Sequence, residues 1–220
     1  MGRFAYRHAW RAINAALVLV LGVLLARGAE AVTVVAFGDS LTAGYGIADA
    51  SQHFHARLEQ SLKAAGVDAK VINAGVSGDT TAAGLARLDW SIPDGVDLVI
   101  LELGANDALR GIQPAVTQAN LDAMLAKLAA RKIPVLLAGM LAPPNLGSQY
   151  GSLFNTIFPR LSEKFAVPLY PFFLDGVAAQ PPLLQNDGMH PKPEGVEVIV
   201  RNITPYVLWA LKAGPKPPGA

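Results

Sequence analysis

Three side chains of the sequence have the types and the order needed for nucleophilic acyl transfer. Ser40 follows an apolar run and precedes a glycine-containing turn, so its hydroxyl can project from the end of a strand. A serine hydroxyl is a weak nucleophile, and it needs a base within hydrogen-bond reach and a third group that orients the base. His190 is the candidate base, and Asp187 lies three residues before it, with Gly188 between them to permit a tight turn. This spacing predicts that the Asp187 carboxylate folds back onto the imidazole and fixes its tautomer.

The remaining histidines are weaker candidates for the base. His8 belongs to an arginine-rich N-terminal segment, whereas His53 and His55 fall near the start of a predicted amphipathic helix and are expected to be solvated imidazoles. An Asp-x-x-His pattern alone is also compatible with a loop aspartate beside a surface histidine. The assignment of His190 and Asp187 therefore depends on further motifs.

Acyl transfer also needs hydrogen-bond donors aimed at the oxygen that becomes negatively charged. The candidates are the backbone N–H groups of Ser40 and Gly78 and the side-chain amide of Asn106. Gly78 lies in a glycine-rich loop, where the absence of a side chain lets the backbone approach a ligand. Taken singly, Gly78 is equally compatible with a simple turn, and Asn106 with a helix cap.

Five short apolar runs alternate with segments of helical period, which predicts parallel βαβ units. The near-continuous Val, Leu and Ile content of these runs indicates a sheet that is covered on both faces. We therefore predict an α/β fold, a three-layer sandwich around a five-stranded parallel sheet. The predicted strands are 32–37, 69–73, 97–103, 134–139 and 167–170. The predicted helices include 54–65, 116–130, 150–165 and 193–211, the last with a kink or break near Pro205.

Open parallel sheets bind ligands outside the carboxyl ends of their strands. The candidate residues follow such ends. Ser40 comes after the first predicted strand, Gly78 after the second and Asn106 after the third, while Asp187 and His190 lie beyond the last. We therefore expect four loops to converge on one edge of the sheet.

Composition excludes several other classes of protein. The 220 residues contain no cysteine, which excludes disulfides, thiolate metal sites and a cysteine nucleophile. The 18 Lys and Arg residues nearly balance the 17 Asp and Glu residues, and the sequence has no run of basic residues that would indicate nucleic-acid binding. The sequence has no G-x-S-x-G elbow, which an α/β-hydrolase would show, and no G-x-G-x-x-G fingerprint, which a dinucleotide-binding protein would need. Its histidines are too few for a two-metal phosphoesterase. We predict neither a metal nor a cofactor.

The first 31 residues differ from the rest of the chain. Three arginines, at positions 3, 7 and 11, precede an apolar stretch of 15 residues. As a helix this stretch would reach roughly 22 Å, short of the ~30 Å hydrocarbon core of a bilayer. Ala29-Glu30-Ala31 fits a cleavage site, so we predict a signal peptide over 1–31 and a mature start at Val32. An uncleaved membrane anchor is the alternative.

Removal of this leader leaves 14 basic and 16 acidic residues, a net charge of −2, and the composition of an ordinary globular domain. We predict one domain over 32–213 and a flexible Pro- and Gly-rich tail over 214–220. The expected location is the periplasm or the exterior of the cell, with no stable membrane span after cleavage.

Four short blocks of the sequence resemble, in order and spacing, the motifs of the GDSL, or SGNH, hydrolases. They are Gly38-Asp39-Ser40-Leu41, Gly78, Gly104-Ala105-Asn106-Asp107 and Asp187-Gly188-Met189-His190. The resemblance spans nearly the whole chain after residue 31, and it is strongest to the periplasmic arylesterases, acyl thioesterases and lysophospholipases of that family. It implies the SGNH hydrolase fold, with the flavodoxin-like strand order 2-1-3-4-5. It also implies that Ser40 is nucleophile and oxyanion donor, that Gly78 and Asn106 are further donors, that His190 is the base and that Asp187 orients it.

The resemblance implies a monomeric serine esterase that hydrolyses small acyl esters, thioesters or lysophospholipids through an acyl-enzyme. The residues Leu109, Ile112, Pro143 and Leu146 are candidates for the wall of an acyl groove, and the loop 140–151 is a candidate wall or lid. Two alternatives remain: a non-catalytic lipid or glycan binding module on the same fold, and a carbohydrate O-acetyl esterase.

Overall fold

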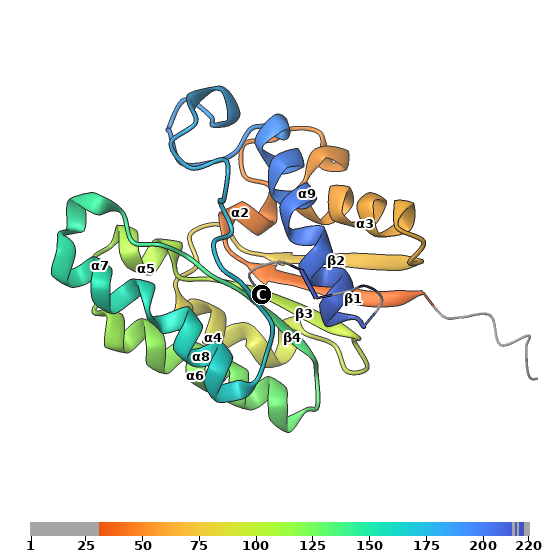
Figure 1. Ribbon diagram of the computed structural model, residues 1–220, viewed down its shortest axis with the longest axis horizontal. Helices are drawn as coiled ribbons and strands as arrows, with labels where there is room; N and C mark the ends of the chain where they lie inside the picture. Colours follow the sequence, from red (N-terminus) through yellow and green to blue (C-terminus); the bar gives the residue numbers. More distant parts are fainter. Residues whose placement is uncertain (1–30, 213, 215, 218–220) are drawn as a thin grey trace, which may run out of the picture. The chain divides into compact units, whose positions relative to one another are not determined.

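The centre of the fold is a five-stranded, fully parallel sheet (Figure 1). The computed structural model describes residues 31–212, 214, 216 and 217. The strand order is β2-β1-β3-β4-β5, which confirms the predicted order. The strands are β1 (Val32–Gly38), β2 (Ala69–Gly75), β3 (Leu98–Glu102), β4 (Val135–Ala138) and β5 (Leu169–Tyr170).

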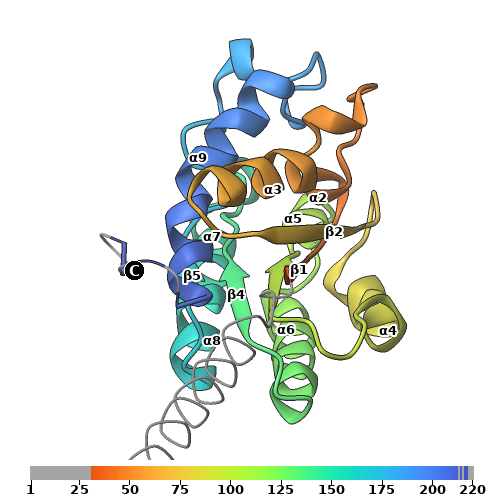
Figure 2. The same ribbon diagram turned by 90° about the vertical axis from the view of Figure 1, so that its right-hand side faces the viewer.

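Helices cover both faces of the sheet and complete the predicted three-layer sandwich (Figures 1 and 2). On one face, α3 (Phe54–Ala64) packs against α9 (Pro193–Ala210). On the other face lie α4 (Thr81–Ser91), α6 (Pro114–Ala130) and α8 (Ile157–Phe165). The shorter elements are α2 (Ser40–Ala43), α5 (Ala105–Leu109) and α7 (Ser148–Asn155), with 3₁₀ turns at Ala50–Gln52, Pro144–Leu146 and Pro181–Leu183.

The central strands are apolar because both of their faces are covered. Every residue of β3 is buried, as are the last five residues of β1. Alternation of polar and apolar residues is therefore absent from these strands, and the continuous apolar runs predicted them correctly. The strands end at the same edge of the sheet, because parallel strands share one direction.

Two predicted helices differ from the structure at a proline. The segment predicted as one helix over 150–165 is two helices, α7 and α8, separated at Thr156. Pro159 has no N–H to donate to the carbonyl of Asn155, so α7 ends there, and the proline lies in the first turn of α8, where no donor is needed. Of the kink or break predicted near Pro205, the break is wrong, because α9 continues through Pro205. Arg201, whose carbonyl loses its partner at Pro205, is exposed, so water can satisfy that group.

The predicted signal peptide lies outside the described residues, apart from Ala31, and the predicted tail is described only at residues 214, 216 and 217. No helix in the described part of the chain combines the length and the apolar character that a membrane crossing requires. The domain boundaries and the cleavage site stay predictions.

Candidate active site

Ser40 begins α2 at the carboxyl end of β1, which pairs with β2 on one side and with β3 on the other. The Asp39 side chain caps this short helix by accepting a hydrogen bond of 3.0 Å from the N–H of Leu41. Gly38 lets the end of β1 lie close against β3, because a Cβ atom there would lie 2.4 Å from Glu102 Oε2 and 2.6 Å from the Glu102 carbonyl. The Asp39 cap and this close contact with β3 together position Ser40.

The structure brings the three predicted triad residues together. The Ser40 hydroxyl lies 2.9 Å from His190 Nε2, and His190 Nδ1 lies 2.6 Å from Asp187 Oδ2. The second oxygen of Asp187 accepts the backbone N–H groups of Met189 and His190, at 2.9 and 3.0 Å. These hydrogen bonds, from the His190 N–H first, lower the pKa of Asp187 to about 2. The carboxylate therefore stays charged beside the imidazole at neutral pH.

Four residues that the sequence analysis did not select hold the histidine loop in place. An isolated bridge joins Leu184 to Pro191, and the N–H of Gln185 donates to the carbonyl of His190 at 2.7 Å. The Gln185 side-chain amide also donates to the carbonyl of Tyr45 at 2.8 Å, across 140 residues of sequence. The Tyr45 ring lies 4.5 Å from the His190 ring, centroid to centroid. No motif signals the contacts of Tyr45 with Gln185 and His190, because they join distant parts of the chain.

The expectation that His53 and His55 are solvated is wrong, because both are half-buried. His53 Nε2 lies 2.9 Å from the carbonyl of Ile47, and its ring lies close against Gly44. Burial lowers the pKa of His55, and the neighbouring His53 lowers it further. Both rings pack at the start of α3, and neither contacts the triad.

Gly78 lies in the loop that follows β2, at the predicted edge of the sheet. The N–H of Asp79 donates to the carbonyl of Val76 at 3.2 Å, so Gly78 is the third residue of a tight turn. Its φ is +87°, a conformation that glycine adopts without steric cost. Arg110 Nη2 donates to the Gly78 carbonyl at 2.8 Å and fixes the plane of that peptide.

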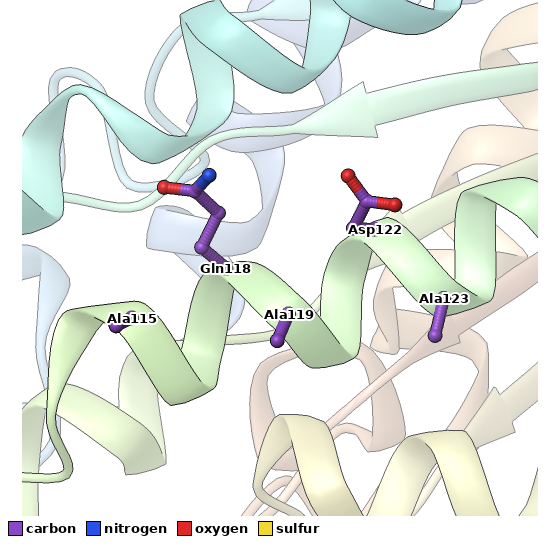
Figure 3. A pocket seen from close by; sticks show the side chains of 5 residues that line it. All are labelled: Ala115, Gln118, Ala119, Asp122 and Ala123. Atoms are coloured by element: carbon purple, nitrogen blue, oxygen red, sulfur yellow. The ribbon is translucent and has the colours of Figure 1, made fainter.

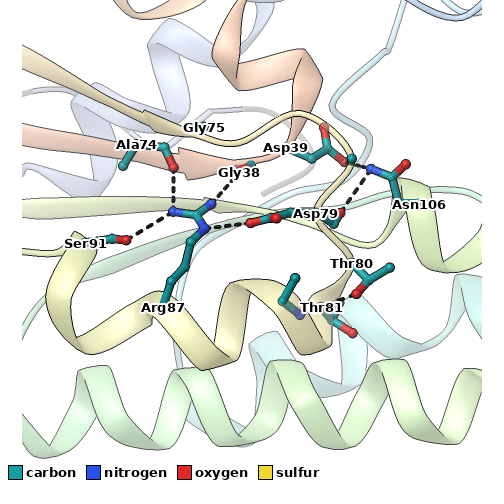
Figure 4. Close-up of polar contacts among 12 residues, drawn as sticks. Gly38, Asp39, Ala74, Gly75, Asp79, Thr80, Thr81, Arg87, Ser91 and Asn106 are labelled. Atoms are coloured by element: carbon teal, nitrogen blue, oxygen red, sulfur yellow. Dashed lines mark hydrogen bonds and ion pairs between the residues drawn. The ribbon is translucent and has the colours of Figure 1, made fainter.

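Asn106 lies in α5, directly after β3, and its side-chain amide joins two of the other loops (Figure 4). Its Nδ2 atom donates to Asp39 Oδ2 at 3.1 Å and to the carbonyl of Asp79 at 3.0 Å. The next residue, Asp107, is buried and accepts the N–H of Thr81 at 2.8 Å, which fixes α5 to the start of α4. Asn106 thus connects the Ser40 turn with the Gly78 loop and is no helix cap.

A pair of buried carboxyl groups lies beneath Ser40. Burial raises the pKa of Asp39 to about 6, although hydrogen bonds from Leu41 and Asn106 oppose the rise. Burial also raises the pKa of Glu102 well above its ordinary value, and the charge of Asp39 adds to this effect. Glu102 Oε2 accepts the Thr42 hydroxyl at 2.8 Å and the Asp39 N–H at 3.3 Å. Burial and the neighbouring Asp39 charge thus favour the neutral form of Glu102, while the hydrogen bond from the Asn106 amide favours the charged form of Asp39.

The four residues predicted to bind the acyl chain do not converge on one described cavity. Leu109, at the end of α5, is 54% exposed, and Ile112 follows it in the connection to α6. Pro143 and Leu146 are half-buried in the loop after β4. The Tyr150 hydroxyl donates to the Ile112 carbonyl at 2.7 Å and so ties this loop to the end of α5.

Two open depressions on the described surface differ in their relation to the triad. One, of about 680 Å³, includes the triad aspartate and is lined by Tyr45, Gly46, Gln185, Asn186, Asp187 and Lys192. The other, of about 410 Å³, lies along α6 and is lined by Ala115, Gln118, Ala119, Asp122 and Ala123, none of which belongs to the site (Figure 3). Among the described residues, no group of three or more His, Asp or Glu side chains is arranged to hold a metal ion.

The model of the GDSL-like lipase/acylhydrolase family matches residues 36–198, which include every predicted site residue. The chain belongs to this family. It is 40% identical over 184 residues to the esterase TesA of Pseudomonas aeruginosa, covering 83% of this chain and 91% of the relative. It is also 40% identical over 196 residues to thioesterase 1/protease 1/lysophospholipase L1 of Escherichia coli K12, covering 88% of each chain.

Solved structures agree with this assignment. AlinE4, an esterase of the SGNH hydrolase family, has a TM-score of 0.70 at 50% identity and covers 83% of this chain and 97% of its own. EstA from Pseudoalteromonas sp., inhibited by monoethylphosphonate in its crystal structure, has a TM-score of 0.77 at 32% identity, over 82% of this chain and 98% of its own. The protein is thus an ester-bond hydrolase of the SGNH family.

Proposed function

We propose that this hydrolase is a serine esterase that cleaves acyl esters and thioesters through an acyl-enzyme on Ser40. The observation that carries the proposal is the unbroken hydrogen-bonded chain from the Ser40 hydroxyl through His190 to Asp187, with distances of 2.9 and 2.6 Å. Asn106 Nδ2, one of the candidate oxyanion donors, joins the Asp39-Ser40 turn to Asp79, the residue after Gly78. A binding module has no need for an oriented nucleophile and base at such distances.

The proposed acylation begins when His190 Nε2 accepts the proton of the Ser40 hydroxyl, while Oγ forms a bond to the carbonyl carbon of the substrate. The Asp187 carboxylate stabilises the resulting imidazolium. The carbonyl oxygen becomes negatively charged and accepts hydrogen bonds from the N–H groups of Ser40 and Gly78 and from the Asn106 amide. Collapse of this intermediate breaks the bond to the leaving alcohol or thiol, which takes the proton from Nε2.

Deacylation repeats these steps with water in place of serine. His190 Nε2 accepts a proton from the water as its oxygen attacks the acyl carbon, and the Ser40 oxygen leaves and recovers the proton. In the free protein both N–H bonds of the Asn106 amide are already used, by Asp39 and by the Asp79 carbonyl. The oxyanion must therefore share or replace one of these acceptors. Because both hydrogen bonds exist in the free protein, the amide is held in place before the substrate arrives.

The substrate class follows from the relatives and from the residues around the triad. The relatives are named as an arylesterase, an esterase and a thioesterase that is also a lysophospholipase. We propose acyl esters and thioesters, lysophospholipids included, with the acyl chain against the exposed Leu109 and against Ile112, Pro143 and Leu146 in the two loops that the Tyr150 hydroxyl ties together. The predicted signal peptide places this activity in the periplasm or outside the cell, which N-terminal sequencing of the exported protein tests.

Labelling with a fluorophosphonate tests the nucleophile. The folded protein should form one adduct, and peptide mass spectrometry should map it to Ser40. Ser40→Ala should give neither adduct nor turnover. Ser51→Ala is the matched control, because the Ser51 hydroxyl also contacts a titratable side chain, at 2.7 Å from Asp49 Oδ1, but lies outside the site and should leave labelling unchanged. The absence of an adduct at Ser40 would instead favour a non-catalytic lipid or glycan binding module.

A substrate series tests the chemistry of the leaving group and the acyl chain. p-Nitrophenyl esters from acetyl to palmitoyl, the matching thioesters and acetylated sugars should be assayed side by side. We expect hydrolysis of both esters and thioesters. Activity confined to acetyl groups on sugars would contradict this proposal and support a carbohydrate O-acetyl esterase.

A further inference from the structure

One buried arginine contacts the active-site loops without touching the reacting atoms. Arg87 lies in α4, and only 6% of its surface is exposed. Its Nε donates to Asp79 Oδ2 at 2.6 Å, and its Nη2 donates to the carbonyl of Gly38 at 2.8 Å (Figure 4). Its Nη1 donates to the carbonyl of Ala74 at 2.9 Å and to Ser91 Oγ at 3.3 Å. The guanidinium therefore binds several segments of the chain at once.

The acceptors of Arg87 are the ends of the strands that carry the site. Gly38 ends β1 two residues before Ser40, and Ala74 lies at the end of β2, where the Gly78 loop begins. Asp79 directly follows Gly78. A planar guanidinium presents its donors in a rigid fork, so contacts to all three fix the distances between the segments. The carbon of the guanidinium also lies 4.0 Å from the centre of the Phe37 ring, which limits its movement.

The contact between Arg87 and Asp79 affects the two proposed oxyanion donors outside Ser40, which are Gly78 and Asn106. The Asp79 carbonyl accepts the Asn106 amide at 3.0 Å, so a shift of Asp79 changes the direction of that amide. Gly78 is bonded covalently to Asp79, and the N–H of Asp79 closes the turn that contains Gly78, so the position of Asp79 also sets that of the Gly78 backbone. Replacing a buried ion pair by apolar residues is often neutral or stabilising. Stability alone is thus a weak reason for a buried pair at this place.

We infer that Arg87 is a positioning residue for catalysis, which holds the Gly78 N–H and the Asn106 amide in the geometry that stabilises the oxyanion. This inference rests on the proposed function, because it assigns Arg87 to the same oxyanion hole. Arg87 acts through Asp79 and the ends of β1 and β2, and it makes no contact with the substrate. Its loss should therefore lower kcat and leave KM nearly unchanged.

Replacement of Arg87 by methionine tests the inference, with p-nitrophenyl butyrate as substrate. A misplacement of catalytic groups by about 1 Å can cost about 100-fold in rate. We expect Arg87→Met to lower kcat about 10- to 100-fold and to change KM less than about threefold. The loss of kcat is smaller than for complete removal of an oxyanion donor, because the donors are misplaced and not absent. Arg87→Lys keeps the charge beside Asp79 but lacks the fork, so it should recover only part of the loss. Rates are divided by the concentration of sites labelled with fluorophosphonate, so unfolded protein does not contribute.

A second set of variants separates positioning from folding. Arg87→Met leaves Asp79 buried without its partner and can impair folding. The double variant Asp79→Asn/Arg87→Met contains no unpaired charge, and its kcat should fall no further than that of the worse single variant. Arg131→Met is the matched control. Arg131 also donates to a backbone carbonyl, of Ile92 at 2.7 Å, and to Asp94, but at the opposite edge of the sheet, before β3.

The outcomes distinguish the inference from the proposed function. If wild-type protein labels at Ser40 while the folded Arg87→Met and double variants keep kcat within about twofold, Arg87 is not a positioning residue. A rise in KM alone, or an equal loss of kcat in Arg131→Met, would overturn the inference as well. If wild-type protein does not label at Ser40, the proposed function itself fails.

Discussion

Replacing Asn106 by alanine should affect catalysis and stability through two separable effects. The Asn106 amide is one of three proposed oxyanion donors, and the loss of one such donor typically lowers kcat about 10²- to 10³-fold. The same amide is one of two N–H donors to the buried Asp39 carboxylate, the other being the Leu41 N–H. Asn106→Ala therefore removes a donor from the transition state and a partner from a buried charge.

The stability effect should depend on pH because Asp39 titrates. A hydrogen bond to a charged group contributes roughly 1.5–3 kcal/mol, so Asn106→Ala should lower the free energy of unfolding by about that amount at pH 8. In the wild type, burial raises the pKa of Asp39 from 3.8 to about 6, so stability falls as pH rises through that interval. Without the Asn106 amide the pKa of Asp39 rises further, and the free energy of unfolding continues to fall up to a higher pH. The difference between the two proteins should thus be small at pH 5 and large at pH 8.

Urea denaturation at pH 5 and pH 8, together with kcat for p-nitrophenyl butyrate, measures both effects. Asn202→Ala is the matched control, because the Asn202 amide donates to a backbone carbonyl, that of Asp175, at 3.1 Å and outside the site. It should leave kcat unchanged and lower stability equally at both pH values. A loss of stability in Asn106→Ala that does not change with pH would refute the role of Asp39, and a loss of kcat below tenfold would refute the oxyanion role.

Four further substitutions give three distinct tests. Gly78→Ala and Gly66→Ala should each cost about 1–2 kcal/mol of stability, since their φ values are +87° and +86° and neither new Cβ would clash. Only Gly78→Ala should lower kcat, and equal kcat values would exclude Gly78 as a donor. Asp187→Asn should lower kcat about 10³- to 10⁴-fold by stabilising the wrong tautomer of His190, and near-normal activity would exclude a triad. Leu62→Ala, in the buried face of α3, should lower the free energy of unfolding by about 2–5 kcal/mol, with kcat per labelled site unchanged.

The sequence predicted the parts of the site that depend on local geometry. Asp187 and His190 are three residues apart, so a single turn through Gly188, with φ of +70°, brings them into contact. The strands were predicted from continuous apolar runs, since a sheet covered on both faces leaves no polar positions within them. The parallel arrangement then places Ser40 and Asn106 at one edge.

The helix α4 shows where such reasoning fails. Its sequence gives no regular apolar stripe, because the inward positions include Thr81, Gly84 and the charged Arg87. Periodicity detects a helix only when its buried side chains are apolar. Arg87 is buried because carbonyl oxygens and a carboxylate from other segments surround its guanidinium, and no local pattern carries that information.

By itself, then, the sequence predicted the candidate nucleophile, the candidate base and its carboxylate, and the sheet that carries them, because each depends on neighbouring residues or on a repeated apolar pattern. Only the tertiary structure revealed Tyr45 against His190, Glu102 beneath Asp39 and Arg87 between the strand ends. These contacts join residues that are 145, 63 and up to 49 positions apart. Their geometry exists only after the strands have paired, so spacing along the chain could not predict it.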